Sequence, residues 1–100
     1  MANETQVVQR PETDRYEILT DGQVAGFVTY HEADDVVVLD HTEVQPAFEG
    51  EGLAGDLARG TFEDLRARGV RVQPLCSYMA SWVGKHPEYA DLVVPDEQPG

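Results

Sequence analysis

The sequence predicts a mixed α+β fold, in which an antiparallel β-meander precedes a β-α-β crossover with one long helix and a short C-terminal helix. Three observations predict this class. Three segments rich in β-branched residues come first and are joined by very short turns, so they can only be antiparallel neighbours. A segment with apolar residues at helical spacing follows them. Another extended segment comes next, and a strand, a helix and a strand in that order form a crossover with parallel strands.

The chain length sets the domain organisation. One hundred residues correspond to one domain of common size, and a hydrophobic fraction of 41% is typical of a soluble globular protein. Residues 1–12 are polar and aperiodic, and we expect them to form a flexible N-terminal arm. The folded domain is expected over residues 13–94, and a flexible tail over residues 95–100.

The predicted meander has three strands. Arg15–Thr20 alternates apolar and polar residues, which is typical of a half-buried strand. The next two residues are Asp-Gly, a strong signal for a two-residue hairpin, and Val24–Glu32 is the expected return strand. A short Ala-Asp-Asp turn then leads into Val36–Val44, whose β-branched residues favour a third strand.

The predicted long helix follows a break at Pro46, because proline donates no hydrogen bond to a strand ladder. Apolar residues recur at three- and four-residue spacing over Leu53–Leu65, which indicates an amphipathic helix of about four turns. Gly60 lies inside this helix, and we expect it to let the helix pack closely on the sheet. Gly69 is a suitable residue to end the helix, and the two arginines just before it complement the helix dipole.

The rest of the chain completes the crossover. Val70–Cys76 is the fourth predicted strand, and it should run parallel to the third because a helix connects them. Ser77–Tyr89 has the composition of a second helix that stops between Gly84 and Pro87. Asp91–Pro95 is predicted to be a short extended end.

The charge balance is strongly acidic. Nineteen acidic and seven basic residues give a formal net charge of -12. This balance excludes the nucleic-acid-binding classes, because nucleic-acid phosphates demand a basic face. The acid excess has two explanations that composition leaves open: solubility or adaptation to a salty cytoplasm, or steering of a cationic substrate such as an amine or polyamine.

The sequence also bears on location and on metals. No run of apolar residues approaches the length of a membrane span, and the first residues contain neither a basic nor an apolar segment typical of a secretory signal. The single cysteine, Cys76, excludes an internal disulfide and fits a reducing cytoplasm, so a cytoplasmic protein is expected. Cys76 and the three histidines lack paired ligand spacing, so no metal site is expected.

Gly50, Gly52 and Gly55 fit the spacing G-x-G-x-x-G of dinucleotide-binding loops. That interpretation fails, because it requires the loop to follow the first strand of a parallel sheet, and three antiparallel strands come first here. A P-loop is excluded because no Lys-Ser/Thr pair follows. A glycine-rich turn that leads into a helix still gathers unpaired backbone N–H groups at the positive end of the helix dipole. The pattern therefore predicts a general anion site, with a loop that binds nothing as the alternative.

Four short motifs stand in order along the chain: HTEV at 41–44, EGLA at 51–54, CSY at 76–78 and KHP at 85–87. Together with the meander and the helix, they resemble the small single-domain branch of the GNAT N-acetyltransferase superfamily, over residues 15–93. The superfamily pattern Arg/Gln-x-x-Gly-x-Gly/Ala, whose amides hold the pyrophosphate of coenzyme A, maps onto Glu49, Gly52 and Ala54. Glu49 departs from that pattern, since it is acidic where the superfamily has Arg or Gln.

The resemblance implies a GNAT-like splayed sheet, in which the third and fourth predicted strands separate, and acetyl-CoA as co-substrate. The backbone of residues 41–44 would pair with the pantetheine arm. The implied cofactor-binding residues lie at the end of the third strand, in the glycine loop and after the fourth strand: Val44, Glu49, Gly50, Glu51, Gly52, Leu53, Ala54, Gly55, Ser77 and His86.

The implied reaction is transfer of an acetyl group from acetyl-CoA to an amine, which needs a base for the amine and a proton for the departing thiolate. Cys76 is a candidate proton donor or acyl acceptor, and Tyr78 is the rival acid. His41 and Glu43 are the candidate bases, and strand alternation places both on one face with Thr42 on the other. Each of these side chains also has a purely structural interpretation.

The expected partners are few. A tight Asp-Gly turn replaces the helices with which larger relatives build part of the acceptor pocket, so we expect an open acceptor side and an unidentified small or protein-borne amine. We expect a monomer or weak homodimer, with neither nucleic acid nor membrane as partner. Two other functions stay open: a non-catalytic module that binds coenzyme A or acyl-CoA, and a structural α/β domain with a degenerate site.

Overall fold

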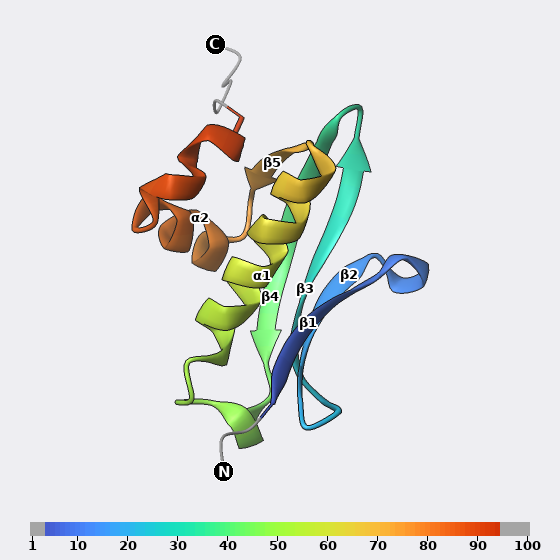
Figure 1. Ribbon diagram of the computed structural model, residues 1–100, viewed down its shortest axis with the longest axis vertical. Coiled ribbons are helices and arrows are strands. Elements are labelled where there is room, and N and C mark those ends of the chain that lie inside the picture. The colour runs from blue at the N-terminus through green and yellow to red at the C-terminus, as the bar shows by residue number, and fades with distance from the viewer. Residues whose placement is uncertain (1–3, 95–100) are drawn as a thin grey trace.

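The computed structural model describes residues 4–94, which form a mixed sheet with helices packed on one side (Figure 1). The strand order is β1-β2-β3-β4-β5, and neighbours are antiparallel except for the parallel pair β4 and β5. This confirms the predicted α+β class and the crossover. The strands are β1 (Thr5–Arg10), β2 (Arg15–Thr20), β3 (Gln23–Ala33), β4 (Val36–Val44) and β5 (Arg71–Pro74). The helices are α1 (Leu53–Arg68) and α2 (Ser77–Gly84), with short 3-10 turns η1 (Pro11–Thr13), η2 (Pro46–Phe48) and η3 (Pro87–Leu92).

The meander forms as its turn residues predict. Asp21 and Gly22 both have positive φ, 50° and 83°, which is the conformation of a two-residue hairpin turn. Thr20 and Gln23 pair across this turn, and β3 continues antiparallel to β4 as far as the pair Gly26–Val44. The three predicted strands are therefore confirmed.

The expected N-terminal arm is wrong for Thr5–Arg10, which form the edge strand β1. β1 pairs with β2 over its whole length, from Thr5–Thr20 to Arg10–Arg15. Its two adjacent valines give no alternating pattern, so the local sequence carries no strand signal. The strand exists because the free edge of β2 offers hydrogen-bond partners and the surface of α1 offers a place for Val7. The predicted tail at 95–100 lies outside the described residues.

Helix α1 packs closely on the sheet at Gly60, which has no side chain. A Cβ atom added at Gly60 would lie 2.6 Å from the Cβ of Val7, so the absence of a side chain lets α1 approach β1 closely. Its inner face is fully buried, and this face carries Leu57, Phe62 and Leu65. The expected close contact at Gly60 is confirmed, and its partner is the strand that sequence reasoning missed.

Helix α2 and η3 are fixed to α1 by aromatic rings. Trp82 of α2 stacks on Phe62 of α1, with ring centroids 5.5 Å apart. The predicted extended end is wrong for Asp91 and Leu92, which belong to η3. Of its described residues, 91–94, only Val93 forms a bridge, to Val72 of β5. No helix within residues 4–94 combines the length and apolar character needed to cross a membrane.

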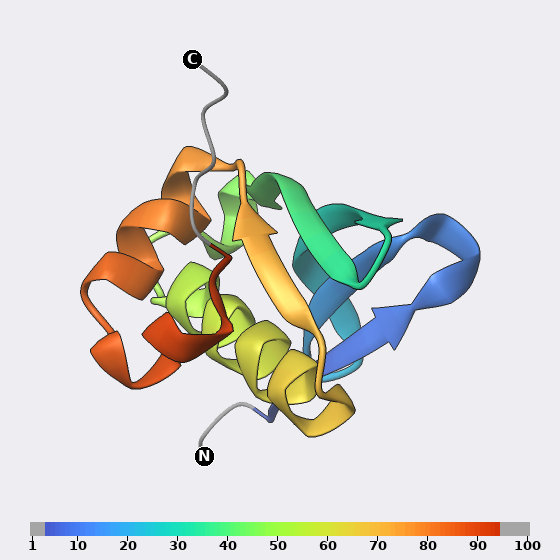
Figure 2. The same cartoon turned by 90° about the horizontal axis from the view of Figure 1, so that it is seen from above.

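The two faces of the sheet differ, and Figure 2 shows both helices on one side of it. Thr42 pairs with Val28, which pairs with Tyr16, and the Tyr16 hydroxyl donates to Asp64 of α1. Thr42 therefore lies on the helix-covered face. Strand alternation then places His41 and Glu43 on the open face, as the sequence predicted relative to Thr42.

Candidate functional site

The site begins where β4 and β5 separate. The parallel pairing runs only from Val36–Arg71 to Leu39–Pro74. The carbonyl oxygen of Leu39 accepts from the backbone N–H groups of both Leu75 and Cys76, each at 3.0 Å, and no pairing continues beyond it among the described residues. On its other side β4 has an extra residue, Asp40, because Leu39 pairs with Tyr30 while His41 pairs with its neighbour Thr29. A bulge of this kind bends a strand locally, and the parallel pairing with β5 ends directly before it, which agrees with the predicted splayed sheet.

The start of α1 supplies free backbone donors. Gly50 and Gly52 have φ of 87° and 75°, conformations that L side chains rarely adopt, and Gly52 is the N-cap residue. No side chain of residues 4–94 caps this end. The first bond of the helix runs from the N–H of Asp56 to the carbonyl of Gly52, at 3.3 Å. The three amides between them, at residues 53–55, have no acceptor in the part of the chain that the structure describes.

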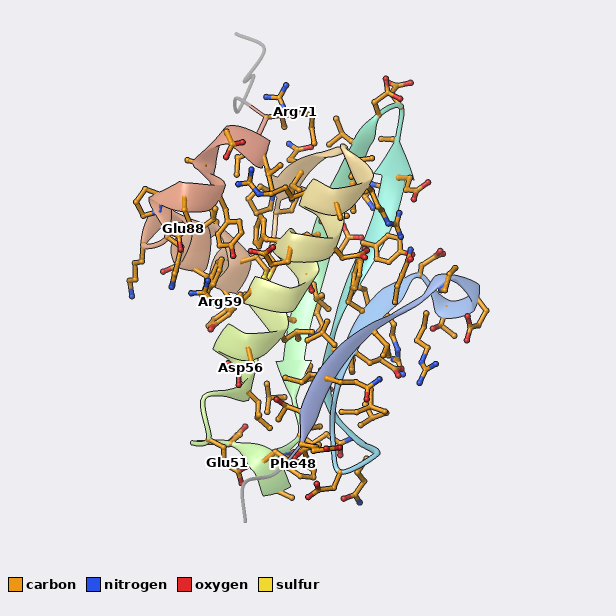
Figure 3. The ribbon with its side chains drawn as sticks, in the orientation of Figure 1. Phe48, Glu51, Asp56, Arg59, Arg71 and Glu88 are labelled. Carbon is orange, nitrogen blue, oxygen red and sulfur yellow. The ribbon has the colours of Figure 1, made fainter. Side chains whose placement is uncertain are left out.

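These amides border a pocket of about 200 Å³. Its walls come from the end of β4, the glycine loop, the first turn of α1 and the start of α2: Val44, Phe48, Glu49, Gly50, Gly52, Leu53, Ala54, Gly55 and Tyr78. Seven of the ten predicted cofactor-binding residues are in that set, whereas Glu51, Ser77 and His86 are not. Figure 3 shows Phe48, Glu51 and Asp56 around the loop that leads into α1. Sequence reasoning missed Phe48, although an apolar residue directly before the loop was a usable signal.

Cys76 lies at the point of separation. It is the N-cap residue of α2, is partly buried, and its sulfur lies 3.1 Å from the hydroxyl oxygen of Thr42. This contact joins β4 to the start of α2 just beyond the last paired residues. Sequence reasoning did not select Thr42, but strand alternation placed it on the face opposite His41, which is the face that Cys76 occupies.

Apolar surface is exposed on both sides of Cys76. Among the described residues the exposed large hydrophobic side chains are Leu75 and Tyr78, at 61% and 38% exposure. Tyr78 also lines the pocket, whereas Leu75 does not. Burial raises the pKa of Tyr78, and the negative charge of Asp56 raises it further, so the phenol stays protonated at neutral pH.

His41 and Glu43 form a pair on the open face. The Nε2 atom of His41 lies 3.0 Å from a carboxylate oxygen of Glu43, and both side chains are 61% exposed. The ring of His41 also lies 6.4 Å from that of Phe27, measured between centroids. Neither residue lines the pocket. Val44, the next residue of β4, does line it, because strand alternation turns its side chain to the helix-covered face. A role for the pair as a base stays a prediction.

Ser77 and His86 are less well placed for a cofactor. Ser77 is the exposed first residue of α2. The ring of His86 stacks on Trp82 at 3.8 Å between centroids, and its Nδ1 atom lies 2.7 Å from the Trp82 carbonyl oxygen. These contacts give His86 a structural role at the end of α2, and cofactor binding by either residue stays a prediction.

Comparisons with known proteins agree with this geometry. A GCN5-like protein from Staphylococcus aureus, solved by NMR, superposes with a TM-score of 0.69 at 21% identity, over 93% of this chain and 91% of that one, which shows a shared fold. None of the curated proteins matches the chain. The profile of the GCN5-related N-acetyltransferase family matches residues 15–92, as the motifs predicted. Because that match spans most of the sequence, the chain belongs to the GCN5-related N-acetyltransferase family.

Proposed function

We propose that the protein is an N-acetyltransferase that uses acetyl-CoA and an amine acceptor. One observation carries this proposal: unpaired amides at the start of α1 open into a pocket directly beside the separation of β4 and β5. A helix start with free N–H groups favours an anion, and a separated strand pair leaves backbone groups free to bind an extended ligand. Membership of the family supports the same conclusion.

The residues present fit coenzyme A in shape and in backbone chemistry. The amides of Leu53, Ala54 and Gly55 would hold the diphosphate, because no protein group in the described chain competes for them. Among the residues that the structure describes, the backbone of residues 41–44 has no strand partner on its β5 side, and it would hold the pantetheine arm. Leu75 and Tyr78 offer exposed apolar surface beside it. When bound, the thioester supplies an activated acetyl group.

Cys76 would manage the proton or the acyl group on the helix-covered face. It is the N-cap residue of α2, at the point where β4 and β5 separate. The contact with Thr42 fixes the position of the sulfur and lets it exchange a hydrogen bond with the hydroxyl. The thiol would either donate its proton to the departing thiolate or accept the acetyl group. Tyr78, which stays protonated, is the alternative proton donor.

His41 and Glu43 would serve the acceptor on the open face. An alkylammonium with a pKa of about 10.4 must lose a proton before it attacks, which costs about 4.6 kcal/mol at pH 7. A histidine whose ring is oriented by a carboxylate is a suitable base for this step. No helix in the described chain covers this face, so an acceptor amine has free access to it.

The test follows thiol release from acetyl-CoA with a broad panel of small amines and peptides. We expect release above the rate without enzyme for at least one acceptor. Intact mass after incubation with acetyl-CoA, compared with Cys76→Ala, shows whether the cysteine carries the acetyl group. Thermal stabilisation by coenzyme A with no turnover on any acceptor would leave a binding module. No stabilisation at millimolar coenzyme A would contradict the proposal altogether.

A further inference from the structure

The pocket combines an anion-binding backbone with acidic side chains. Glu49 lines the pocket, Glu51 follows it in the loop, and Asp56 stands in the first turn of α1. Figure 3 shows Glu51 and Asp56 at the same corner of the molecule. No lysine or arginine lines the pocket within the described residues. The negatively charged side chains therefore repel an anionic ligand that the backbone N–H groups attract.

The arginines of the described chain are engaged elsewhere, and Lys85, the one lysine of the sequence, is the C-cap residue of α2. Arg59 is the nearest along α1, but its guanidinium lies 3.7 Å from Glu88 and donates to the hydroxyl of Tyr89 at 3.1 Å (Figure 3). Arg71 lies at the far end of the molecule in the same view. The remaining arginines of the described chain each form an ion pair away from the pocket: Arg10 and Arg15 with Glu17, Arg66 with Asp91, and Arg68 with Asp64.

Of the acidic side chains, Glu49 lines the pocket and the charge of Asp56 reaches it. After burial, the charge of Asp56 is the next cause that raises the pKa of Tyr78, a pocket residue, so its field reaches the space that the ligand would occupy. Glu49, Glu51 and Asp56 are all exposed, so salt screens their charges effectively. Hydrogen bonds from the amides act at contact distance, where screening is weak. Salt therefore removes the repulsion and leaves the attraction.

We propose that Glu49, Glu51 and Asp56 reverse the usual salt dependence of coenzyme A binding, so that affinity rises with ionic strength. This inference rests on the proposed function and concerns the same site. A protein that holds phosphates with lysines and arginines loses affinity as salt increases. Here the screening length falls from about 10 Å at 0.1 M to about 3 Å at 1 M salt, which removes most of the repulsion between exposed carboxylates and the phosphates. The three carboxylates thereby make the affinity for coenzyme A depend on the ionic strength.

The experiment measures the dissociation constant of coenzyme A by isothermal titration calorimetry at 0.1, 0.3 and 1 M KCl, on the full chain, with folding checked by circular dichroism. Pantetheine, which has no phosphate, is the control ligand. We expect coenzyme A to bind about tenfold more tightly at 1 M than at 0.1 M, because the shorter screening length weakens the repulsion between the carboxylates and the phosphates, and we expect pantetheine affinity to stay constant. The variant Glu49→Gln/Glu51→Gln/Asp56→Asn should bind tightly at 0.1 M and lose the dependence.

A matched variant separates the site from the overall charge. Glu12→Gln/Glu32→Gln/Asp35→Asn removes the same charge from exposed positions away from the glycine loop, and it should keep the salt dependence of the wild type. Coenzyme A binding that weakens with salt would overturn the inference and leave the proposed function standing. A dependence that disappears in the matched variant and persists in the site variant would also overturn it. No coenzyme A binding at any salt concentration would overturn the proposed function and, with it, the inference.

Discussion

The two ends of α1 are built in opposite ways. At the C-terminal end, Gly69 adopts a left-handed conformation, its N–H donates to Arg66, and Val70 donates to Leu65. Arg68 there forms an ion pair with Asp64. At the N-terminal end, Gly52 is also left-handed, but no side chain caps the helix, and the amides that follow have no acceptor in the described chain.

The difference separates stability from binding within one element. Unpaired backbone groups at a helix end cost free energy, and the C-terminal end avoids that cost with its own backbone. The N-terminal end leaves its N–H groups free beside a pocket, which is useful only where a ligand accepts hydrogen bonds from them. Changes at one end should therefore alter folding, and changes at the other should alter binding.

The largest effect should come from a carboxylate placed at the binding end. Ala54→Glu puts a negative charge among the free amides and into the pocket, so coenzyme A affinity should fall at least about 100-fold, or 2.7 kcal/mol. Folding should be unchanged or slightly improved, because acidic residues suit a helix start. The matched variant Ala67→Glu in the last turn should lose about 0.3–1 kcal/mol of stability and keep its affinity. Isothermal titration calorimetry measures the coenzyme A affinity of the two variants, and urea unfolding measures their stability. Equal affinities in the two variants would contradict the proposed difference between the two ends of α1.

The two left-handed glycines allow a second matched pair. Gly69→Ala and Gly52→Ala each force a side chain into positive φ, which costs about 1–2 kcal/mol of folding free energy. Gly69→Ala should leave the dissociation constant of coenzyme A unchanged, whereas Gly52→Ala should also weaken binding. Urea unfolding and calorimetry on both variants provide the measurement. If binding suffers equally at the two positions, the loop has no special role.

The contact between Tyr16 of β2 and Asp64, in the C-terminal half of α1, should make the free energy of unfolding depend on pH in the alkaline range. Burial, then the hydrogen bond to Asp64, raises the pKa of Tyr16 above its usual value of 10.0. A raised folded-state pKa gives stability that is complete below the unfolded pKa and is lost as pH increases above it. Wild-type stability should therefore fall above pH 10. Tyr16→Phe should lose about 1 kcal/mol at pH 8 and lack this part of the alkaline decline, as urea unfolding at several pH values would reveal. Parallel declines in both proteins would count against the contact.

The smallest expected effect concerns the exposed ion pair at the C-terminal end. Arg68→Ala removes the contact between Nε of Arg68 and a carboxylate oxygen of Asp64, which lie 3.1 Å apart. This change should lower the free energy of unfolding by about 0.2–1 kcal/mol at low salt. The cost should vanish at 1 M KCl, because salt screens exposed pairs. The two ends of α1 would then respond to salt in opposite directions. A cost that persists at 1 M would mean that Arg68 stabilises the helix through packing.

The site was predictable only in part. The glycine loop carried its own signal, because positive φ at Gly50 and Gly52 requires glycine and the spacing into a helix is local. Thr42 and Phe48 were missed, since their contribution depends on which face of β4 meets α2 and on how η2 folds over the pocket. His86 was selected by its motif, yet stacking on Trp82 determines its position.

The sequence by itself determined the order of the elements, the hairpin at Asp21-Gly22, the parallel crossover and the free amides at the start of α1, because turn chemistry and apolar periodicity act over a few residues. Only the tertiary structure decided that Thr5–Arg10 form a strand, that Cys76 meets Thr42, and that the arginines are engaged away from the pocket. These features depend on partners far away in the chain, on a free strand edge, a bulge and the packing of α1, and no local pattern encodes them.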